Sequence, residues 1–296
     1  MPTLYISTSN GIYQMDEEKR KPVLIFSKKW GALSPKKTAG RFFGICYDPD
    51  SDKIIFTTRE RFRLFKHNKP TTHARLYEMD PATKAYKAIG TISDIHDVHQ
   101  IDCAKNCVIA TDTGKNRLLV FDKTRKKVVQ KIVLGKKRAD IHHINALLIK
   151  DNKLKIGLNN RGNADSQILT LDLSLINNGV KKFDALEKGE LYTIDGVVHS
   201  HDLEICNNKV LCCSSKEGTV VNTNSSEILI EQDKWARGLT CTGNYLWLGE
   251  SVYAKRSERH RTDLSGAIKK YSLTDFTLLE SIKMEGAGQV NDIIHL

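Results

Sequence analysis

Short segments in which apolar and polar residues alternate make up most of this chain. Examples are KIIFTT at 53–58, RLLVFD at 117–122 and EILIEQ at 227–232, and turn sequences such as DPDSDK and SKEGT separate them. Alternation with a period of two is typical of β-strands. The best helix candidate, residues 172–183, is short and is interrupted by Asn-Asn-Gly. The pattern therefore predicts an all-β protein.

The strands fall into groups of four that recur along the chain. Clear groups cover residues 99–134, 201–232 and 237–284. Successive groups are spaced by about 35–55 residues, which is the range of propeller blades with loop insertions. We count six groups, whose first strands begin near Phe43, His99, Asn145, His201, Arg237 and Asn291. The repeat predicts a six-bladed β-propeller in a single domain over residues 1–296; seven blades or an irregular sandwich are the alternatives.

The sixth group is incomplete, and this predicts how the ring closes. The chain ends with one strand, QVNDIIHL, whereas the N-terminus supplies three strands without a first one: TLYISTS, GIYQMD and PVLIFSK. Completing the N-terminal blade with the C-terminal strand removes open sheet edges. We therefore expect the two ends of the chain to share one blade.

Aligning the six first strands predicts two rings of side chains around the propeller axis. The first ring consists of Phe43, His99, Asn145, His201, Arg237 and Asn291. The second ring lies two residues earlier, on the same side of each strand because side chains alternate, and consists of Arg41, Asp97, His143, His199, Trp235 and Gln289. All of these except Phe43 are polar, charged or Trp although apolar residues flank them. We expect them to line a polar funnel.

Histidines dominate this funnel and predict chemistry for it. Neutral imidazole binds zinc, manganese, iron, nickel or copper, so we expect a divalent transition metal on His99, His143 and His201. Asp97 or Asp202 would orient these ligands from behind. His96, His142 and His199 are the candidate acids or bases. The alternative is that the histidines only line a hydrated channel and bond to one another and to the backbone.

Arginine and aromatic residues at the same mouth indicate an anionic ligand. A planar guanidinium suits carboxylate, sulfate or phosphate groups, and Arg237 is a candidate for both catalysis and binding. The other candidate substrate-binding residues are Arg41, Asn145, Trp235, Gln289, Asn291 and Tyr253. Salt bridges from these arginines to Asp97 or Asp292, and packing of Trp235 between blades, are the structural alternatives. The loop at 255–261 is interpreted as a lid over the mouth or as a plain insertion.

Composition indicates which partners and which compartment to expect. The net charge is +11, which attracts anionic partners, but no basic tail or basic-aromatic module indicates nucleic acid. There is no apolar run long enough to span a membrane and no leader pattern. The seven cysteines lie mostly in apolar strands, which favours buried free thiols and a cytoplasmic protein over a zinc site at Cys103, Cys107, Cys212 and Cys213.

Two segments resemble known proteins. WARGLTCTGNYLWLGES at 235–251 and HSHDLEICNNKVLCCSS at 199–215 resemble the R-G-L, G-x-S and H-S segments of an uncharacterised family of bacterial propeller-like proteins. That resemblance implies the propeller fold and no activity. The axial placement of polar residues is also similar in design to gluconolactonase-type lactonases and oligogalacturonate lyases, although their local motifs are absent here.

Taken together, the sequence predicts a metal-dependent enzyme that acts on a small anionic substrate. The substrate would be an acidic sugar or another carboxylate, and lyase, hydrolase and isomerase chemistry remain open. The sequence lacks a serine elbow, a phosphate loop, a dinucleotide fingerprint and a metalloprotease motif. Two alternatives remain: a metal-free module that binds an anionic ligand or a protein partner, and metal-free acid–base catalysis by histidine and arginine.

Overall fold

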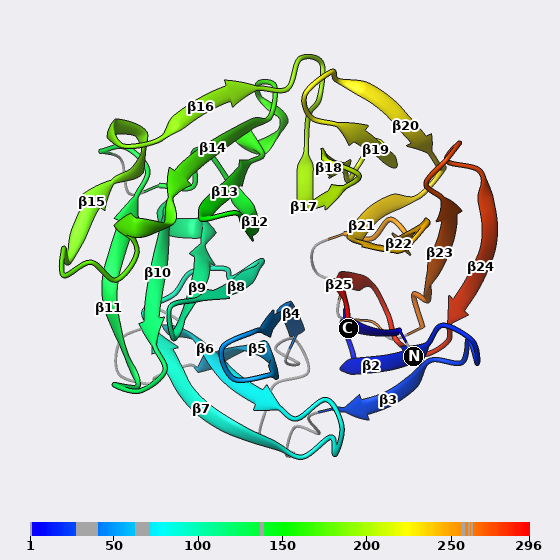
Figure 1. Ribbon diagram of the computed structural model, residues 1–296, viewed down its shortest axis with the longest axis horizontal. Coiled ribbons are helices and arrows are strands. Elements are labelled where there is room, and N and C mark those ends of the chain that lie inside the picture. The colour runs from blue at the N-terminus through cyan, green and yellow to red at the C-terminus, as the bar shows by residue number, and fades with distance from the viewer. Residues whose placement is uncertain are drawn as a thin grey trace.

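Six β-sheets are arranged in a ring around a central axis (Figure 1). The structure is a computed structural model, and it describes residues 2–27, 41–62, 71–136, 139–255, 258–259, 261 and 263–296. The all-β, six-bladed propeller predicted from the repeat is confirmed. We number the blades 1 to 6 in chain order, and the strand nearest the axis is the inner strand.

Each blade is a sheet of four strands, except blade 3, which has five. Blades 1 and 2 contain β25 (Val290–His295), β1 (Thr3–Thr8), β2 (Ile12–Asp16) and β3 (Val23–Phe26), and then β4 (Arg41–Asp48), β5 (Lys53–Phe62), β6 (Thr71–Met79) and β7 (Tyr86–Ser93). Blades 3 and 4 contain β8 (Ile101–Ala104), β9 (Cys107–Asp112), β10 (Arg117–Asp122), β11 (Lys127–Val133) and β15 (Lys182–Asp184), and then β12 (Ile144–Lys150), β13 (Lys153–Leu158), β14 (Gln167–Asp172) and β16 (Glu190–Thr193). Blades 5 and 6 contain β17 (Ser200–Cys206), β18 (Lys209–Ser214), β19 (Thr219–Asn222) and β20 (Glu227–Glu231), and then β21 (Trp235–Thr242), β22 (Tyr245–Ser251), β23 (Gly266–Ser272) and β24 (Leu278–Met284).

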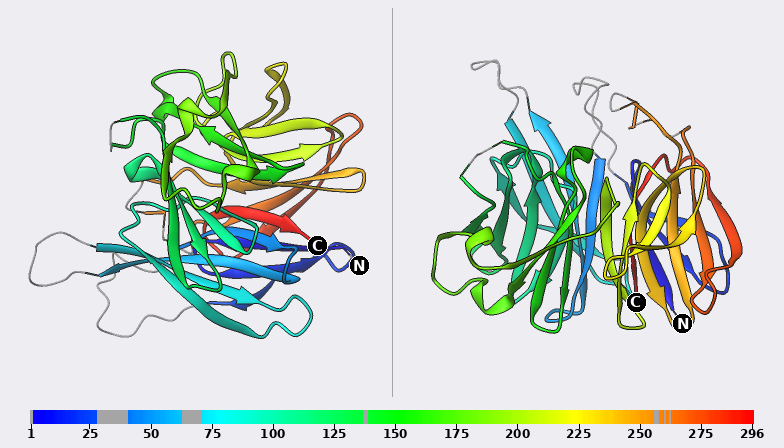
Figure 2. Two further views of the ribbon diagram at one scale, coloured as in Figure 1. Left: turned by 60° about the vertical axis from the view of Figure 1, so that its left-hand side comes forward. Right: turned by 90° about the horizontal axis from the view of Figure 1, so that it is seen from above.

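The C-terminal strand closes the ring, as the incomplete sixth group predicts. β25 pairs antiparallel with β1, with Ile293 opposite Ile6, and so forms the inner strand of blade 1. The two ends are tied further because Thr3 N donates to Leu296 O at 2.7 Å. Both termini consequently lie close together on one face of the ring (Figure 2).

Hydrophobic clusters between neighbouring blades hold the ring together. Each of the six interfaces contains one cluster; the cluster between blades 6 and 1, for example, includes Trp247, Ile268, Leu4 and Ile6. Strands within a blade differ accordingly: every residue of β9 is buried, whereas most of β24 is not. Sheets that pack on both faces need apolar residues on both, which explains the near-continuous apolar runs of the middle strands.

The segment at 172–183, the best helix candidate in the sequence, forms no α-helix. Its first residues form a 3₁₀ turn, Leu173–Leu175, capped by Asp172, which accepts a hydrogen bond from Ser174 N. Asn177 and Gly179 then have φ of 54° and 90°, and the left-handed backbone ends any helix. The segment instead crosses to blade 3, where β15 pairs in parallel with β11 before the chain returns to blade 4 as β16.

The cysteines are not all free, which corrects the expectation of buried thiols only. Cys206 on β17 and Cys241 on β21 form a disulfide that joins the inner strands of blades 5 and 6. The other five are free and buried: Cys46, Cys103, Cys107, Cys212 and Cys213.

Candidate functional site

Bulges near the start of the inner strands shape the mouth of the channel. In β4, β12, β17 and β25, one residue of the inner strand has no pairing partner in the neighbouring strand. In β21, two consecutive residues have none. The skipped residues are Gly44, Asn145, Asp202, Asn291 and the pair Arg237–Gly238. A bulge bends its strand and re-aims side chains. Three first-ring residues, Asn145, Arg237 and Asn291, are therefore outside the regular ladders.

The second ring is set by an unusual backbone in three consecutive blades. Asp97, His143 and His199 have φ of 70°, 47° and 53°, in the left-handed region. Asp and His enter this region more readily than most residues, and such positions cluster at functional sites. Each residue precedes the inner strand of its blade.

Two cavities meet at this mouth and bring both rings together. The small cavity has a volume of about 60 Å³ and is lined by Ser9, Phe43, Arg59, Asp97, His99, His143, Arg237, Arg259, Gln289 and Asn291. The large cavity has a volume of about 310 Å³ and is lined by His99, His143, Asn145, Asn159, Arg161, His199, His201, Ser215, Lys216, Trp235, Arg237, Tyr253 and Arg259. Every first-ring residue lines one or both, as does every second-ring residue except Arg41, whose side chain lies outside the described residues.

The three histidines predicted as metal ligands lie next to one another. The ring of His99 stands edge-to-face with the rings of His143 and His201, with centroid distances of 5.4 and 5.6 Å. Burial lowers the pKa of His99 well below its usual 6.5 and also lowers the pKa of His201. Both imidazoles are therefore neutral at pH 7, although Asp97 and Asp202 act in the opposite sense.

These histidines do not form a metal centre as they stand. In the described part of the chain, no group of three or more His, Cys, Asp or Glu side chains is placed so as to hold a metal ion. The predicted histidine cluster of metal ligands is therefore not found. A bound transition metal stays a prediction that elemental analysis can test.

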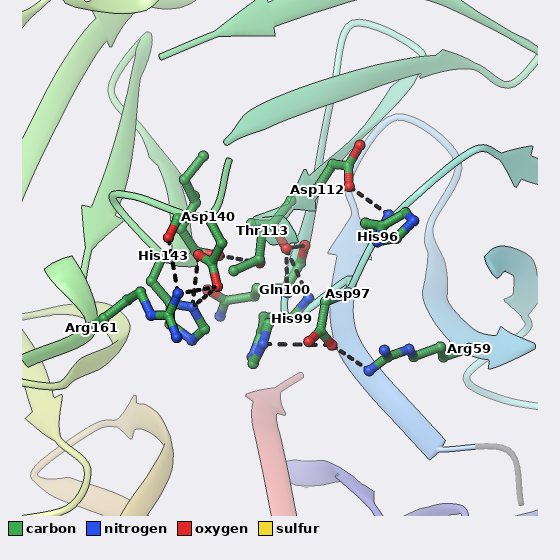
Figure 3. Close-up of polar contacts among 12 residues, drawn as sticks. Arg59, His96, Asp97, His99, Gln100, Asp112, Thr113, Asp140, His143 and Arg161 are labelled. Atoms are coloured by element: carbon green, nitrogen blue, oxygen red, sulfur yellow. Dashed lines mark hydrogen bonds and ion pairs between the residues drawn. The ribbon is translucent and has the colours of Figure 1, made fainter. Parts of the chain in front are cut away.

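Carboxylates engage the axial residues from behind. Asp97 pairs with Arg59 and lies 3.8 Å from His99 Nε2 (Figure 3). His143 Nδ1 lies 2.9 and 3.0 Å from the two oxygens of Asp140. Asp140 therefore holds the His143 ring at the mouth, and Asp97 lies beside the ring of His99; its role as an orienting group stays a prediction.

His199 is fixed from two sides in the same way. Its Nδ1 lies 3.0 Å from Glu217 Oε1, and Glu217 Oε2 accepts a hydrogen bond from Ser214 Oγ at 2.8 Å. The ring also packs on Gly162: a Cβ built on this glycine would lie 2.3 Å from His199 Nε2. The loops of blades 4 and 5 therefore meet at His199.

Two of the predicted acid–base residues do not line either cavity. His96 is exposed and lies away from His99 and His143 (Figure 3). His142 Nδ1 lies 3.3 Å from Asn160 Oδ1, and its neighbour His143 is the one that faces both cavities.

The aromatic residues form one wall of the large cavity together with two arginines. The Arg237 and Arg259 guanidinium carbons lie 4.6 and 4.7 Å from the Trp235 ring centroid. Tyr253, which is 67% exposed, stands edge-to-face with Trp235 at 5.2 Å. The Trp235 indole is itself buried, so it holds the guanidinium groups in place by cation–π contact.

Several ring residues also have structural roles, as the alternative interpretation expects. Asn291 Nδ2 donates to Phe42 O at 2.7 Å, and Gln289 Nε2 donates to Val252 O at 3.1 Å. Asp202 accepts from Gly238 N at 2.6 Å and so links blades 5 and 6. Part of the polar funnel therefore satisfies backbone groups that the bulges expose.

Sequence reasoning missed several residues of the site. Arg59 lies on β5, and Asp140 and Glu217 lie in turns; the alignment of first strands contains none of these positions. Arg259 lines the cavities from the loop at 255–261, which the sequence leaves open as a lid over the mouth or a plain insertion. A sequence signal exists for Asp140 and Glu217, because both lie close to the strands that form the mouth. Asp140 is three residues before His143, and Glu217 is three residues after Ser214, the last residue of β18. No comparable signal marks Arg59.

Further along the inner strands lie carboxylates that are partly or fully buried: Asp102, Glu204 and Asp292. Burial raises the pKa of Asp102 on β8 to about 7 and the pKa of Glu204 on β17 to about 7. Burial also raises the pKa of Asp292 on β25 well above 3.8, and the charge of Asp202 adds to this. Asp102 and Asp292 accept hydrogen bonds from Ile149 N and Ile45 N of the next blade, at 2.7 and 3.1 Å.

We expect Glu204→Gln to change how stability depends on pH. Between an unfolded pKa of 4.5 and a folded pKa of about 7, the folded protein retains a proton that the unfolded chain has lost, so stability falls as pH rises. The Gln side chain retains an oxygen that can accept the hydrogen bond which Ile205 N donates to Glu204 Oε1 at 2.8 Å. Because Gln does not ionise, the fall in stability with rising pH disappears. Relative to the unmodified protein, the variant should gain about 3 kcal/mol in unfolding free energy between pH 4.5 and pH 8. Urea unfolding across this range measures it, with Glu190→Gln as the control; a difference that does not vary with pH contradicts the assignment.

None of the helical segments in the described residues is long and apolar enough to cross a membrane.

Comparisons with known proteins inform the fold and leave the chemistry open. No family model matches this chain, and no curated protein matches it. Among solved structures, a chain from a crystal structure described as a nidogen/laminin complex matches with a TM-score of 0.63 and 12% identity, over 100% of this chain and 98% of that one. At this identity the similarity concerns the fold alone. The chain is thus a six-bladed β-propeller similar to the one in that complex.

Proposed function

We propose that this protein binds a small hydroxylated organic acid at the mouth of its central channel. The observation that carries the proposal is the composition of the large cavity. Among the residues that the structure describes, its lining contains four cationic side chains and no carboxylate: Arg161, which also pairs with Asp140 at 4.0 Å outside the lining, Lys216, Arg237 and Arg259. Confined like charges repel one another, and an anion relieves that repulsion.

Two buried polar atoms support a ligand that also carries hydroxyl groups. Asn145 Oδ1 and His201 Nε2 have no hydrogen-bond partner among the described residues, although both side chains are more than nine-tenths buried. An unpaired buried polar atom is costly, so such atoms usually meet a ligand or water. His201 Nδ1 lies 3.5 Å from Asp202, so the neutral ring has Nε2 as an acceptor when Nδ1 carries the proton. Both atoms then accept hydrogen bonds from hydroxyl groups.

The size of the site fits a small molecule. The large cavity, at about 310 Å³, is at the lower end of the usual range for ligand pockets. A guanidinium fork from Arg237 or Arg259 binds one carboxylate in two contacts. An acidic sugar or another hydroxy acid has the required combination of groups.

Isothermal titration calorimetry with glucuronate, gluconate and inorganic sulfate tests this function. We expect saturable binding of at least one of the two organic acids at one molecule per chain, with sulfate as a competitor. Binding should weaken as salt rises, because the attraction is electrostatic. Absence of saturable binding by any of the three anions contradicts the proposal.

Catalysis is a second candidate, favoured by two histidines at the cavity that are held by carboxylates. Asp140 and Glu217 contact the Nδ1 atoms of His143 and His199, an arrangement that orients a ring for acid–base work. The metal-dependent form of this activity requires a bound ion; metal content below about one-tenth equivalent after reconstitution would end it. Turnover of a bound acid that survives a chelator supports the metal-free form.

A further inference from the structure

We propose that Cys46 and Cys103 form a second disulfide, between blades 2 and 3, when the protein folds in the presence of a disulfide oxidant. In the resting protein both cysteines are free and buried, and their Sγ atoms lie 3.2 Å apart. The S–S distance of a disulfide is about 2.0 Å, so the sulfurs need to approach by only about 1 Å. Neither cysteine lines the two cavities at the mouth, so this site of covalent modification is separate from the ligand site.

The backbones of blades 2 and 3 approach each other closely beside this pair. Cys46 lies on β4 and Cys103 on β8, the inner strands of the two blades. Gly44, at the bulge of β4, has a φ of 44°, and a Cβ built on it would lie 2.7 Å from Ile101 N. A residue with a side chain does not fit here without a shift of the backbone. Two residues further along both strands, the same close approach brings the two sulfurs into contact.

The other free cysteines lie in different interfaces between blades. All seven cysteines are among the described residues, and Cys46 and Cys103 share the hydrophobic cluster between blades 2 and 3. Cys107 belongs to the cluster between blades 3 and 4, Cys212 to that between blades 4 and 5, and Cys213 to that between blades 5 and 6. Successive side chains of a strand point to opposite faces, which separates Cys212 from Cys213. Among the five free cysteines, Cys46 and Cys103 are thus the pair that shares an interface.

The disulfide already present shows that this fold accepts a cross-link of this kind. Cys206 and Cys241 also lie on the inner strands of neighbouring blades, and both contribute to the cluster between blades 5 and 6. They are 35 residues apart in the chain, and Cys46 and Cys103 are 57 residues apart. Each cross-link therefore joins the inner strand of one blade to the inner strand of the next.

The reaction is thiol–disulfide exchange with a small disulfide such as oxidised glutathione. The thiolate of one cysteine attacks the small disulfide, which forms a mixed disulfide and releases one small thiol. The second cysteine attacks the mixed disulfide and releases the other small thiol. Two cysteine thiols are thereby oxidised, one small disulfide is reduced, and the two released thiols take up the two protons.

Burial determines when this exchange takes place. It raises the pKa of Cys46 well above its usual value, and the contact with Cys103 adds to this. The thiolate is the attacking species, so exchange is slow once the protein has folded. The cross-link therefore forms while the chain folds, when the sulfurs meet before water and oxidant are fully excluded.

The experiment refolds the protein from urea, without a reductant, in the presence and in the absence of oxidised glutathione. Each product is then unfolded, alkylated and analysed by mass spectrometry. We expect five alkylated cysteines without the oxidant, and three with it because the cross-link uses two of the five free thiols. Peptide mapping should link the peptide that contains Cys46 to the one that contains Cys103. The oxidised protein should also unfold at a higher urea concentration, because a cross-link over 57 residues restricts the unfolded chain.

Matched alanine variants identify the pair. Cys46→Ala and Cys103→Ala each retain four of the five free cysteines and should form no cross-link, so the number of alkylated cysteines stays at four with the oxidant. Cys107→Ala removes a buried free cysteine from the adjacent strand β9. It should still lose two alkylated cysteines when the oxidant is present.

Three results would overturn the inference. The first is five alkylated cysteines after refolding with the oxidant. The second is a loss of two that persists in Cys46→Ala, or a cross-link that maps to another pair. The third is a stable glutathione adduct on Cys46 or Cys103 in place of the cross-link.

Discussion

Arg237→Met is expected to weaken binding of the organic acid by about 100-fold, which corresponds to about 2.7 kcal/mol. Arg237 lines both cavities and is buried, so its contact with an anion is shielded from water. Met keeps much of the apolar stem that packs near Trp235 and removes the charged fork. Calorimetry with the acid that binds best measures the effect.

Two further variants make this result specific. Arg237→Lys retains the charge and loses the planar fork, so we expect an intermediate loss of about tenfold. Arg125→Met removes an arginine that is 64% exposed in its side chain and lies outside both cavities, and it should bind as the unmodified protein does. Equal affinity of the Arg237→Met variant and the unmodified protein would show that the anion does not bind at the axis.

Breaking the disulfide is expected to cost about 3–4 kcal/mol of unfolding free energy. Cys206 and Cys241 are 35 residues apart, and a cross-link over a loop of this length restricts the unfolded chain by about that amount. It also ties the inner strands of blades 5 and 6 to each other near the end of β21 that is away from Arg237. Urea unfolding of Cys241→Ser, and of the unmodified protein with and without a reductant, measures the loss.

The control for this effect is the double variant Cys206→Ser/Cys241→Ser, whose stability a reductant should not change. Thiol labelling of the unfolded, unreduced protein should modify five cysteines, because five are free in the folded structure. Labelling of all seven would contradict the disulfide and would agree with the reduced interior that composition alone suggests.

The fold could be predicted from the sequence because each blade repeats the same local pattern. Four alternating strands define each blade. The N-terminus supplies only three strands and the C-terminus one, so a closed ring without open sheet edges requires the two ends to share a blade. The crossing of β15 to blade 3 could not be anticipated. The strand β15 has only three residues, Lys182–Asp184, and so short a segment has no pattern that indicates which blade it joins.

The site was partly predictable for the same reason. Residues that begin inner strands converge in any propeller, so His99, Asn145 and His201 could be grouped although they are far apart in sequence. Which of His142 and His143 faces the axis depended on a single-residue register, and the left-handed backbone at His143 decides it.

The remaining parts of the site depend on tertiary contacts that periodicity does not encode. The bulges at Asn145 and Arg237 interrupt the alternation on which the alignment of the two rings relied. Arg259 reaches the axis from a loop, and Arg59 from the second strand of a blade. Adjacency of imidazoles in the ring alignment also does not fix whether they converge on one point, because neighbouring rings can pack edge-to-face, as His99 does with His143 and His201, and no group of the described residues is placed to hold a metal ion.

The most direct test of the central claim, that six inner strands converge on one anion site, is anomalous diffraction from crystals soaked in selenate. We expect a strong selenium peak on the propeller axis, within hydrogen-bonding distance of the Arg237 or Arg259 guanidinium and beside His201. Selenium peaks confined to the outer surface, such as the lysine-rich groove between β11 and β15, with none on the axis, would contradict it.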